Sequence, residues 1–358
     1  MGGNALLGIV LHAIGGFAAG SFYAPLKKVR RWAWESFWLV MGLAAWLAAP
    51  WIVAWLTTPR LLDVLRASPP VAARWCIIFG LLWGVGNLTF GLSVRYLGMA
   101  LGYAVALGFC TVFGTLAPPI FGGLFGGAEG WAKLVAIFTT PAGQAVLAGL
   151  AVCVAGIGLC GWAGMSKESE LTDEQKQDSV AEFSLGKGFA VAVMAGLLSA
   201  CFAFGLSAGK PIAELAHEMG AQQVFSKNAV LVVILLGGLT SNALWCLFLN
   251  FKNRTFGDYA SGPVGEQTRN YLLSILGGVT WYFQFFFYGM GTTQLGERYD
   301  FSSWSIHMAF IIIFSNLWGI IFHEWRGTSG RTKALVWAGI LTLIASTMII
   351  GYGNYLAE

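Results

Sequence analysis

The stretches FGLLWGVGNLTFGLSVRYLG (79–98) and GGVTWYFQFFFYGMGTTQLG (277–296) align with each other without a gap. The aligned pairs are Gly80 with Gly278, Trp83 with Trp281, Phe90 with Tyr288, Gly91 with Gly289, and Leu97-Gly98 with Leu295-Gly296. Each stretch has about the length of a helix that crosses the ~30 Å hydrocarbon core of a bilayer. Chance similarity between apolar segments is the alternative, but the shared aromatic and glycine positions favour two copies of one membrane-spanning unit.

Apolar blocks of this length recur along the whole chain. Hydrophobic residues make up 57% of the 358 residues and charged residues 11%, whereas a soluble domain carries about a quarter charged residues. We expect an all-α integral membrane protein of about ten transmembrane helices. The candidate spans are 5–26, 37–57, 75–97, 99–120, 145–165, 187–209, 225–250, 270–291, 302–322 and 333–353.

The most polar connection, 166–186, joins the fifth span to the sixth. We therefore expect an N-terminal five-helix repeat at 1–165, a hydrophilic linker at 166–186 and a C-terminal five-helix repeat at 187–358. Because five is odd, the second copy enters the membrane inverted. Inverted repeats are typical of secondary transporters, in which one fold in two orientations gives two related conformations.

Basic residues indicate the orientation of the chain. The connections after odd-numbered spans hold fourteen of the 21 Lys and Arg residues, and the opposite side holds seven. The positive-inside rule then places the linker in the cytoplasm and both termini in the periplasm. The basic residues form short runs between apolar blocks, which does not favour nucleic-acid binding.

Polar and aromatic residues inside the spans are the candidates for a substrate site, because such groups usually face a cavity or one another. They are His12 and Tyr23 in the first span, Asn87 in the third, Trp281 and Gln284 in the eighth, and Trp304 and His307 in the ninth. Aromatic rings with amide and imidazole groups suit an uncharged sugar, whose C–H faces stack on rings while its hydroxyls take hydrogen bonds.

A proton-coupled transporter also needs a group that binds and releases protons. Asp300, Ser303, Trp304 and His307 follow the spacing of one helical face. His12 lies about 10 Å from the outer end of the first span, and His307 lies at a similar depth in the ninth, so an acid and two histidines could border one cavity. We expect Asp300 to carry the proton, with His307 as the second candidate because an unperturbed histidine titrates near pH ~6.5.

Each of these residues also has a structural interpretation. Asp300 could cap a helix at the interface, the two histidines could bond neighbouring helices, and Gln284 could do the same. Glu35 and Glu214 are weaker coupling candidates, because both fall in charged connections where an ion pair would explain them.

Other kinds of site have little support. All six cysteines fall inside apolar blocks, without metal-ligand spacing. We expect no metal and no cofactor other than the coupling protons. We find no nucleophile–base set at an interface, so a membrane-embedded enzyme is not favoured.

Four segments carry a family resemblance: FYAPLKKVRRWAWE (22–35), WGVGNLTFGLSVRYLGMALG (83–102), TWYFQFFFYGMG (280–291) and YDFSSWSIHMAF (299–310). The chain resembles the L-rhamnose–proton symporters of the drug/metabolite transporter superfamily, apart from the connections at 121–144 and 166–186. The resemblance implies ten helices in two inverted repeats and proton-coupled uptake of L-rhamnose or a similar 6-deoxyhexose across a bacterial inner membrane. It implies a sugar, protons and the bilayer as partners, with no nucleic acid and no obligate protein partner.

Two transport alternatives stay open. The superfamily's fold serves both directions of transport, so an exporter or exchanger of another small polar metabolite is the main alternative. A passive channel is the other, and it would not need an acid at Asp300.

Overall fold

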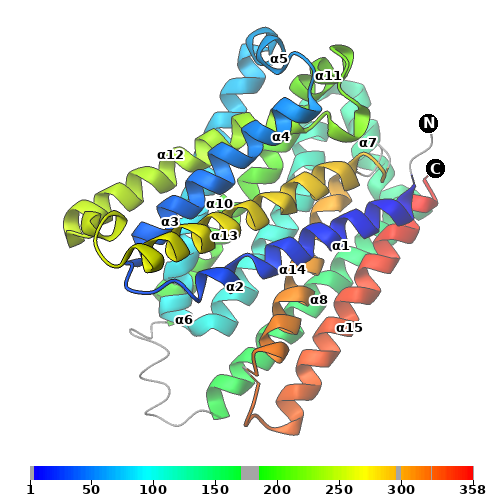
Figure 1. The fold of residues 1–358 in the computed structure, drawn as a ribbon. Coiled ribbons are helices and arrows are strands. Elements are labelled where there is room, and N and C mark those ends of the chain that lie inside the picture. Colours follow the sequence, from blue (N-terminus) through cyan, green and yellow to red (C-terminus); the bar gives the residue numbers. More distant parts are fainter. Residues whose placement is uncertain (1–3, 171–184, 296–299, 324, 358) are drawn as a thin grey trace.

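The computed structural model describes residues 4–170, 185–295, 300–323 and 325–357, with side chains described throughout except at 94, 95, 97–101, 103, 185 and 300. Over these residues the chain is helical and contains no strand (Figure 1). The helices that form most of the spans are α1 (Ala5–Ser21), α3 (Trp34–Gly42), α4 (Ala49–Thr57), α6 (Pro70–Phe125), α8 (Pro141–Glu170), α10 (Leu185–Ala208), α12 (Asn228–Asn253), α13 (Val264–Thr292), α14 (Ser303–Ile321) and α15 (Gly330–Tyr355). The other helices are α2 (Tyr23–Leu26), α5 (Leu61–Ala67), α7 (Gly127–Thr139) and α11 (Lys210–Glu218), with the single turns η2 (Gln223–Phe225), η3 (Phe256–Tyr259) and η4 (Asp300–Ser302).

Ten of the described segments are long and apolar enough to cross a bilayer, which confirms the expected number of spans. The first runs from Ala5 to Leu26, as the sequence predicts. Most ends of the other nine segments lie within a few residues of the predicted ends. The second span, Trp34–Thr57, stays helical by passing through a π-helical segment, η1 (Leu43–Ala48), between α3 and α4. The predicted linker at 166–186 lies mostly outside the described residues.

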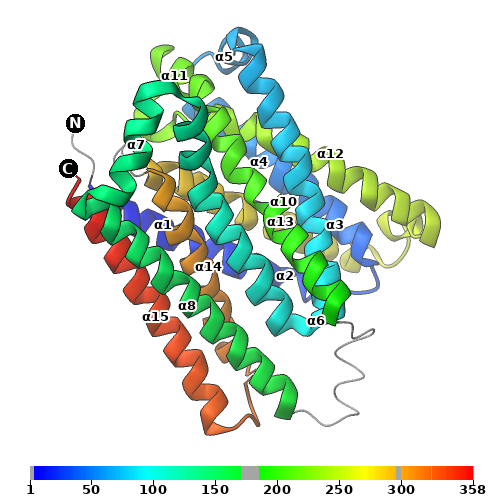
Figure 2. The ribbon, with the colours of Figure 1, turned by 180° about the vertical axis from the view of Figure 1, so that it is seen from behind.

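Helix α6 contains two spans, Pro70–Ser93 and Ala104–Phe125, without a loop between them. Gly86 packs against Leu198 and Ser199 of α10, while Ala106 packs against Gly196 of the same helix. In a straight helix, twenty residues cover about 30 Å, yet the two contacts lie within one turn of α10. Helix α6 therefore doubles back, and Figure 2 shows its two arms descending and returning side by side.

The connections between spans gather at two ends of the bundle. Both termini and the short helices α5, α7 and α11 lie at one end, here called the terminal end (Figure 1). The opposite end, here called the linker end, carries the turn of α6, the α12–α13 connection, the last turn of α8 and the first turn of α10. This alternation is what ten spans require. Which end faces the cytoplasm stays a prediction.

Packing between helices follows a regular pattern across the two halves. Helix α1 packs on α13 and α14, and its counterpart in the second half, α10, packs on the two arms of α6. Helix α8 packs on its own counterpart α15, and α12 packs on α3 and α4. If each helix is replaced by its counterpart in the other half, the same set of packed helix pairs results, as a repeat requires. The inverted relation of the two halves stays a prediction.

Glycines allow these helices to approach closely. A Cβ at Gly80 would lie 2.1 Å from the Ile234 carbonyl oxygen of α12, and one at Gly16 would lie 2.3 Å from Phe310 Cβ of α14. Across α8 and α15, a Cβ at Gly156 would lie 2.8 Å from Leu343 Cγ. Backbones can touch only where small residues line the contact, and this is how helices associate in lipid. The GxxxG pairs Gly16/Gly20 and Gly80/Gly84 therefore lie at packing faces between helices.

Candidate substrate-binding site

His12 of α1 and His307 of α14 lie side by side in the interior of the bundle. Both side chains are fully buried, and their ring centroids are 6.0 Å apart. Gly15 and Gly291 make room for them, because a Cβ at Gly15 would lie 3.3 Å from His307 Cε1 and one at Gly291 would lie 3.0 Å from His12 Nε2. The structure thus brings together the two histidines that the sequence places at similar depth.

The polar atoms of this pair are left without protein partners. None of the four ring nitrogens of His12 and His307 has a hydrogen-bond partner among the described residues. A buried polar atom without a partner costs about 1–3 kcal/mol. Such a cost is tolerated where a ligand, a water molecule or a proton can satisfy the atom in the working protein.

Two aromatic residues complete this group, which we call the histidine cluster: His12, His307, Tyr288 and Trp304. The Tyr288 ring packs against both imidazoles, at 5.3 Å from His12 and 5.1 Å from His307. Trp304 stands 5.8 Å from Tyr288 in an edge-to-face contact. The Trp304 indole donates a hydrogen bond from Nε1 to the Cys110 carbonyl of α6 at 3.1 Å, which fixes its ring.

A second group, the tryptophan cluster, consists of Trp46, Trp83 and Trp281 from three different helices. Their ring centroids are 5.5 to 5.9 Å apart, and all three side chains are buried. Trp46 comes from the π-helical segment η1, a distortion that is frequent at functional sites. Trp83 lies against Gly238, where a Cβ would come within 2.3 Å of its ring.

Two phenylalanines join the clusters into one continuous aromatic surface. Phe285 contacts Trp281 at 5.2 Å and His307 at 6.1 Å. Phe202 of α10 stacks on Phe285 at 3.8 Å and contacts Trp83 at 5.2 Å. Since these rings come from helices on both sides of the linker, the surface lies where the two halves meet.

Amide groups border the tryptophan cluster. Asn87 Nδ2 donates to Asn242 Oδ1 at 3.3 Å, and the same oxygen accepts a hydrogen bond from Trp38 Nε1 at 3.3 Å. Asn242 Nδ2 in turn donates to the carbonyls of Gly84 and Gly238, which orients its amide. Asn87 is only partly buried, so it keeps donor and acceptor capacity for a ligand.

Gln284 lies on α13 between the two clusters, three residues after Trp281 and four before Tyr288. Its side chain is 5% exposed. Its amide makes no hydrogen bond to the residues that the structure describes, unlike that of Asn242. A buried amide in this position offers two donors and one acceptor to a hydroxylated ligand.

The structure describes the backbone of Asp300, the proposed coupling acid. The backbone of Asp300 begins the turn η4, directly before α14, while its side chain lies outside the described part of the chain. Lys227 at the start of α12 donates to Thr292 Oγ1 at 2.7 Å. Thr292 follows Gly291, which contacts His12. A fixed positive charge therefore stands beside the histidine cluster, on the terminal side.

Two predicted residues lie elsewhere than expected. Tyr23 is 40% exposed on α2, and its ring contacts Phe22 and not the rings of either cluster, so its place in the site stays a prediction. Glu35 does not sit in a charged connection but in the first turn of α3, buried. Its carboxylate accepts hydrogen bonds from Asn253 and Thr255 and forms no ion pair with a described residue, so the ion-pair explanation is wrong. Glu214 is exposed on α11.

Several residues of the site were not singled out from the sequence. Tyr288 could have been found, because it follows Trp281 by seven residues and Gln284 by four, on one helix face. Asn242 is a polar residue in the middle of an apolar span, which is also a usable signal. Phe202 and Trp46 carry no such mark, since an aromatic residue in a membrane span is unremarkable by itself.

Comparisons with known proteins agree over the full chain. The family model described as L-rhamnose-proton symport protein matches residues 1–356. The chain is 34% identical over 355 residues to the L-rhamnose-proton symporter of Mannheimia succiniciproducens, with 99% of each chain covered. It is 33% identical over 350 residues to the L-rhamnose-proton symporters of Yersinia pestis and Yersinia pseudotuberculosis, covering 97% of this chain and 98% of theirs. A match of this length and identity, on a ten-span helical fold, means that the chain belongs to the L-rhamnose-proton symport protein family.

Proposed function

We propose that this protein is a secondary active transporter that imports L-rhamnose or a similar 6-deoxyhexose together with protons, by alternating access. The observation that carries the proposal is the match to the symporter family over residues 1–356. Relatives named as L-rhamnose-proton symporters cover the chain from end to end, so the likeness extends to every span that borders the site.

The chemistry of the site supports a sugar substrate. Ring faces from both halves stand beside the amides of Asn87 and Gln284. A 6-deoxyhexose has an apolar methyl group and C–H faces that suit aromatic rings, and hydroxyls that suit amides and imidazoles. Trp281 and Trp304 would stack on the sugar, while Gln284, His12 and His307 would bind its hydroxyls.

Proton coupling is assigned to Asp300 and His307. Asp300 begins η4 directly before α14, and His307 lies seven residues further along on the same helix, beside His12. Protonation of one of these groups would change which hydrogen bonds the site offers to the sugar. Coupling then follows, because a ligand shifts an equilibrium between two states by its difference in affinity for them.

Uptake by the purified protein tests the proposal. Proteoliposomes with an inward pH gradient should accumulate labelled L-rhamnose above the outside concentration, and a protonophore should abolish the accumulation. Counterflow with a panel of deoxyhexoses and pentoses then ranks the substrates. Accumulation of another metabolite in place of every sugar, or sugar equilibration that a pH gradient never drives, would overturn the proposal in favour of an exchanger or a passive channel.

A further inference from the structure

We propose that the linker end holds a binding site for the phosphate group of an anionic phospholipid, formed by Arg30 and Arg269. The site is independent of the sugar site and of the proposed transport function. It occupies a hollow of about 370 Å³ between the α2–α3 connection and the start of α13, lined by Arg30, Arg31, Gly265, Glu266 and Arg269.

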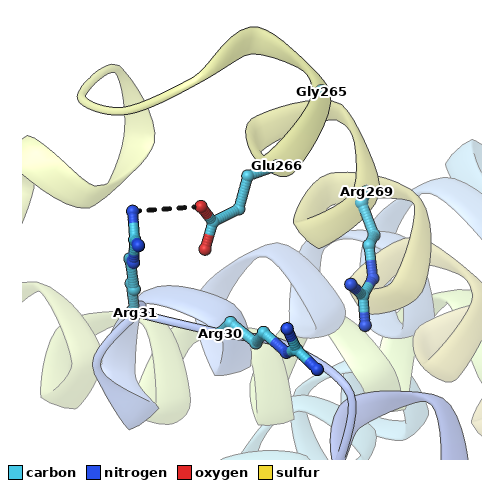
Figure 3. Close-up of a pocket in the computed structure, with 5 residues that line it drawn as sticks. All are labelled: Arg30, Arg31, Gly265, Glu266 and Arg269. Atoms are coloured by element: carbon cyan, nitrogen blue, oxygen red, sulfur yellow. Dashed lines mark ion pairs between the residues drawn. The ribbon is translucent and has the colours of Figure 1, made fainter.

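Three guanidinium groups and a single carboxylate line this hollow. Figure 3 shows Arg31 turned toward Glu266, while the side chains of Arg30 and Arg269 point toward each other on the other side. Arg31 Nη1 lies 3.2 Å from Glu266 Oε2. The one carboxylate is therefore engaged by the residue farthest from the facing pair.

Arg30 and Arg269 have no carboxylate partner among the described residues. Two positive side chains that face each other repel. An anion bound between them attracts both, and this attraction offsets the repulsion. A guanidinium presents several donors in a fixed plane that matches the oxygens of a phosphate group. The arrangement thus fits a phosphate, which can accept hydrogen bonds from both arginines at once.

The backbone beneath the pair is held in place. Asn270 is buried and clamps the main chain of Arg30 in both directions: its Nδ2 donates to the Arg30 carbonyl at 2.8 Å and its Oδ1 accepts from the Arg30 amide at 3.2 Å. Arg269 Nη2 donates to the Lys28 carbonyl at 3.1 Å. These bonds tie the two arginine-bearing segments together, so that little order has to be gained when an anion binds.

The surface next to the hollow identifies a lipid rather than free phosphate. Leu272 and Leu276 follow Arg269 at helical spacing on α13, within a membrane span, and are 62% and 55% exposed. They form an apolar strip that leads from the arginines along the helix. A phospholipid would place its phosphate at the arginines and an acyl chain along this strip, as headgroups do at basic pockets between membrane helices.

Native mass spectrometry on the purified full chain tests the site with phosphatidylglycerol and phosphatidylethanolamine as probes. The wild-type protein should retain phosphatidylglycerol preferentially. Each of Arg30→Gln and Arg269→Gln should weaken its binding by about tenfold, the effect of losing one charge-assisted hydrogen bond. The double variant should lose the preference between the two lipids.

A matched control removes the same charge elsewhere at the linker end. Arg326 and Lys333 are both exposed there and do not line this hollow, so Arg326→Gln with Lys333→Gln should leave phosphatidylglycerol binding within twofold. Arg269→Lys keeps the charge but loses the planar fork, and it should bind the lipid more weakly than wild type. Equal binding by the Arg30→Gln/Arg269→Gln variant and the wild type would overturn the site. Displacement of the lipid by millimolar inorganic phosphate would overturn the lipid assignment and identify free phosphate as the ligand of this hollow.

Discussion

At the scale of single residues, the histidine pair is the most informative feature. Most polar side chains in the spans are satisfied locally, as Thr111 is by the Leu107 carbonyl, whereas the ring nitrogens of His12 and His307 have no partner within the described ranges. In a low-dielectric interior an unsatisfied group is costly. A pair of such groups beside aromatic rings is best explained by a ligand that both rings bind.

Proton coupling gives the first prediction. Asp300→Asn should still bind sugar and exchange it, because asparagine mimics the protonated acid in shape, but a pH gradient should no longer drive accumulation. Should this variant still concentrate sugar, Asp300 is only a helix cap, and His307→Gln becomes the variant expected to uncouple. Both are measured as gradient-driven uptake against counterflow, with the exposed His217→Gln of α11 as a control that should behave as wild type.

Gln284 gives the second prediction. Gln284→Ala removes an amide that makes no hydrogen bond to a described residue. The folded protein should therefore lose little stability, while the sugar loses a hydrogen-bond partner. We expect sugar binding to weaken by about 1–3 kcal/mol, measured by binding to the purified protein. The exposed Gln222→Ala should have no effect. Unchanged affinity in a folded Gln284→Ala protein would remove Gln284 from the site.

Gly114 gives the third prediction. A Cβ there would lie 2.2 Å from Trp304 Nε1, so Gly114→Ala must displace the indole and weaken its hydrogen bond to Cys110. We expect overpacking to cost about 1–3 kcal/mol of stability and sugar affinity to fall as well. Gly91→Ala on the same helix meets nothing within 4 Å and is the matched control. A normal affinity in Gly114→Ala would show that the position of Trp304 is immaterial to binding.

The sequence predicts some of these residues and not others for a physical reason. Depth and helix face follow from residue spacing, which is why His12 and His307 could be placed near each other. Tyr23 is another polar aromatic residue of the first span, but it follows the end of α1 and is 40% exposed on α2. Partners such as Phe202 and Trp46 depend on which helices meet, and spacing within one helix carries no information about that.

At the scale of helices, the spans follow from composition alone, because a run of about twenty apolar residues has no other stable environment. The elements that composition does not predict are local features of the backbone. Helix α7 in the connection at 121–144 and the turn inside α6 keep the backbone helical between predicted spans, and the π-helical segment η1 distorts the helix within the predicted span 37–57. Hydropathy does not distinguish a loop from a distorted helix of the same residues.

The contact between α8 and α15 gives the fourth prediction. A Cβ at Gly156 would lie 2.8 Å from Leu343 Cγ and 3.1 Å from the Leu343 amide nitrogen, so the two helices would have to separate. Gly156→Ala should therefore lower the thermal unfolding midpoint in detergent, with a cost of about 1–3 kcal/mol. Gly158→Ala, two residues away and facing open space, should not. Equal midpoints for the two variants would mean that this close approach does not contribute to stability.

At the scale of the whole molecule, orientation gives the fifth prediction. The termini lie at one end and the turn of α6 at the other (Figures 1 and 2), and the charge bias assigns the linker end to the cytoplasm. Reporters fused after the C-terminus should behave as periplasmic, and reporters within 166–186 as cytoplasmic. A cytoplasmic C-terminus in a fully inserted protein would contradict the assignment.

The doubled-back helix α6 also has a consequence for how the protein is made. Every residue from Pro70 to Phe125 is helical, so the third and fourth spans are joined at the linker end by helical backbone and not by a loop. Lipid does not tolerate an unpaired backbone, and a helical connection keeps the backbone between the two spans hydrogen-bonded while they enter the bilayer. We therefore expect the two spans to insert together as one helical hairpin, which is complete only when synthesis has reached residue 125.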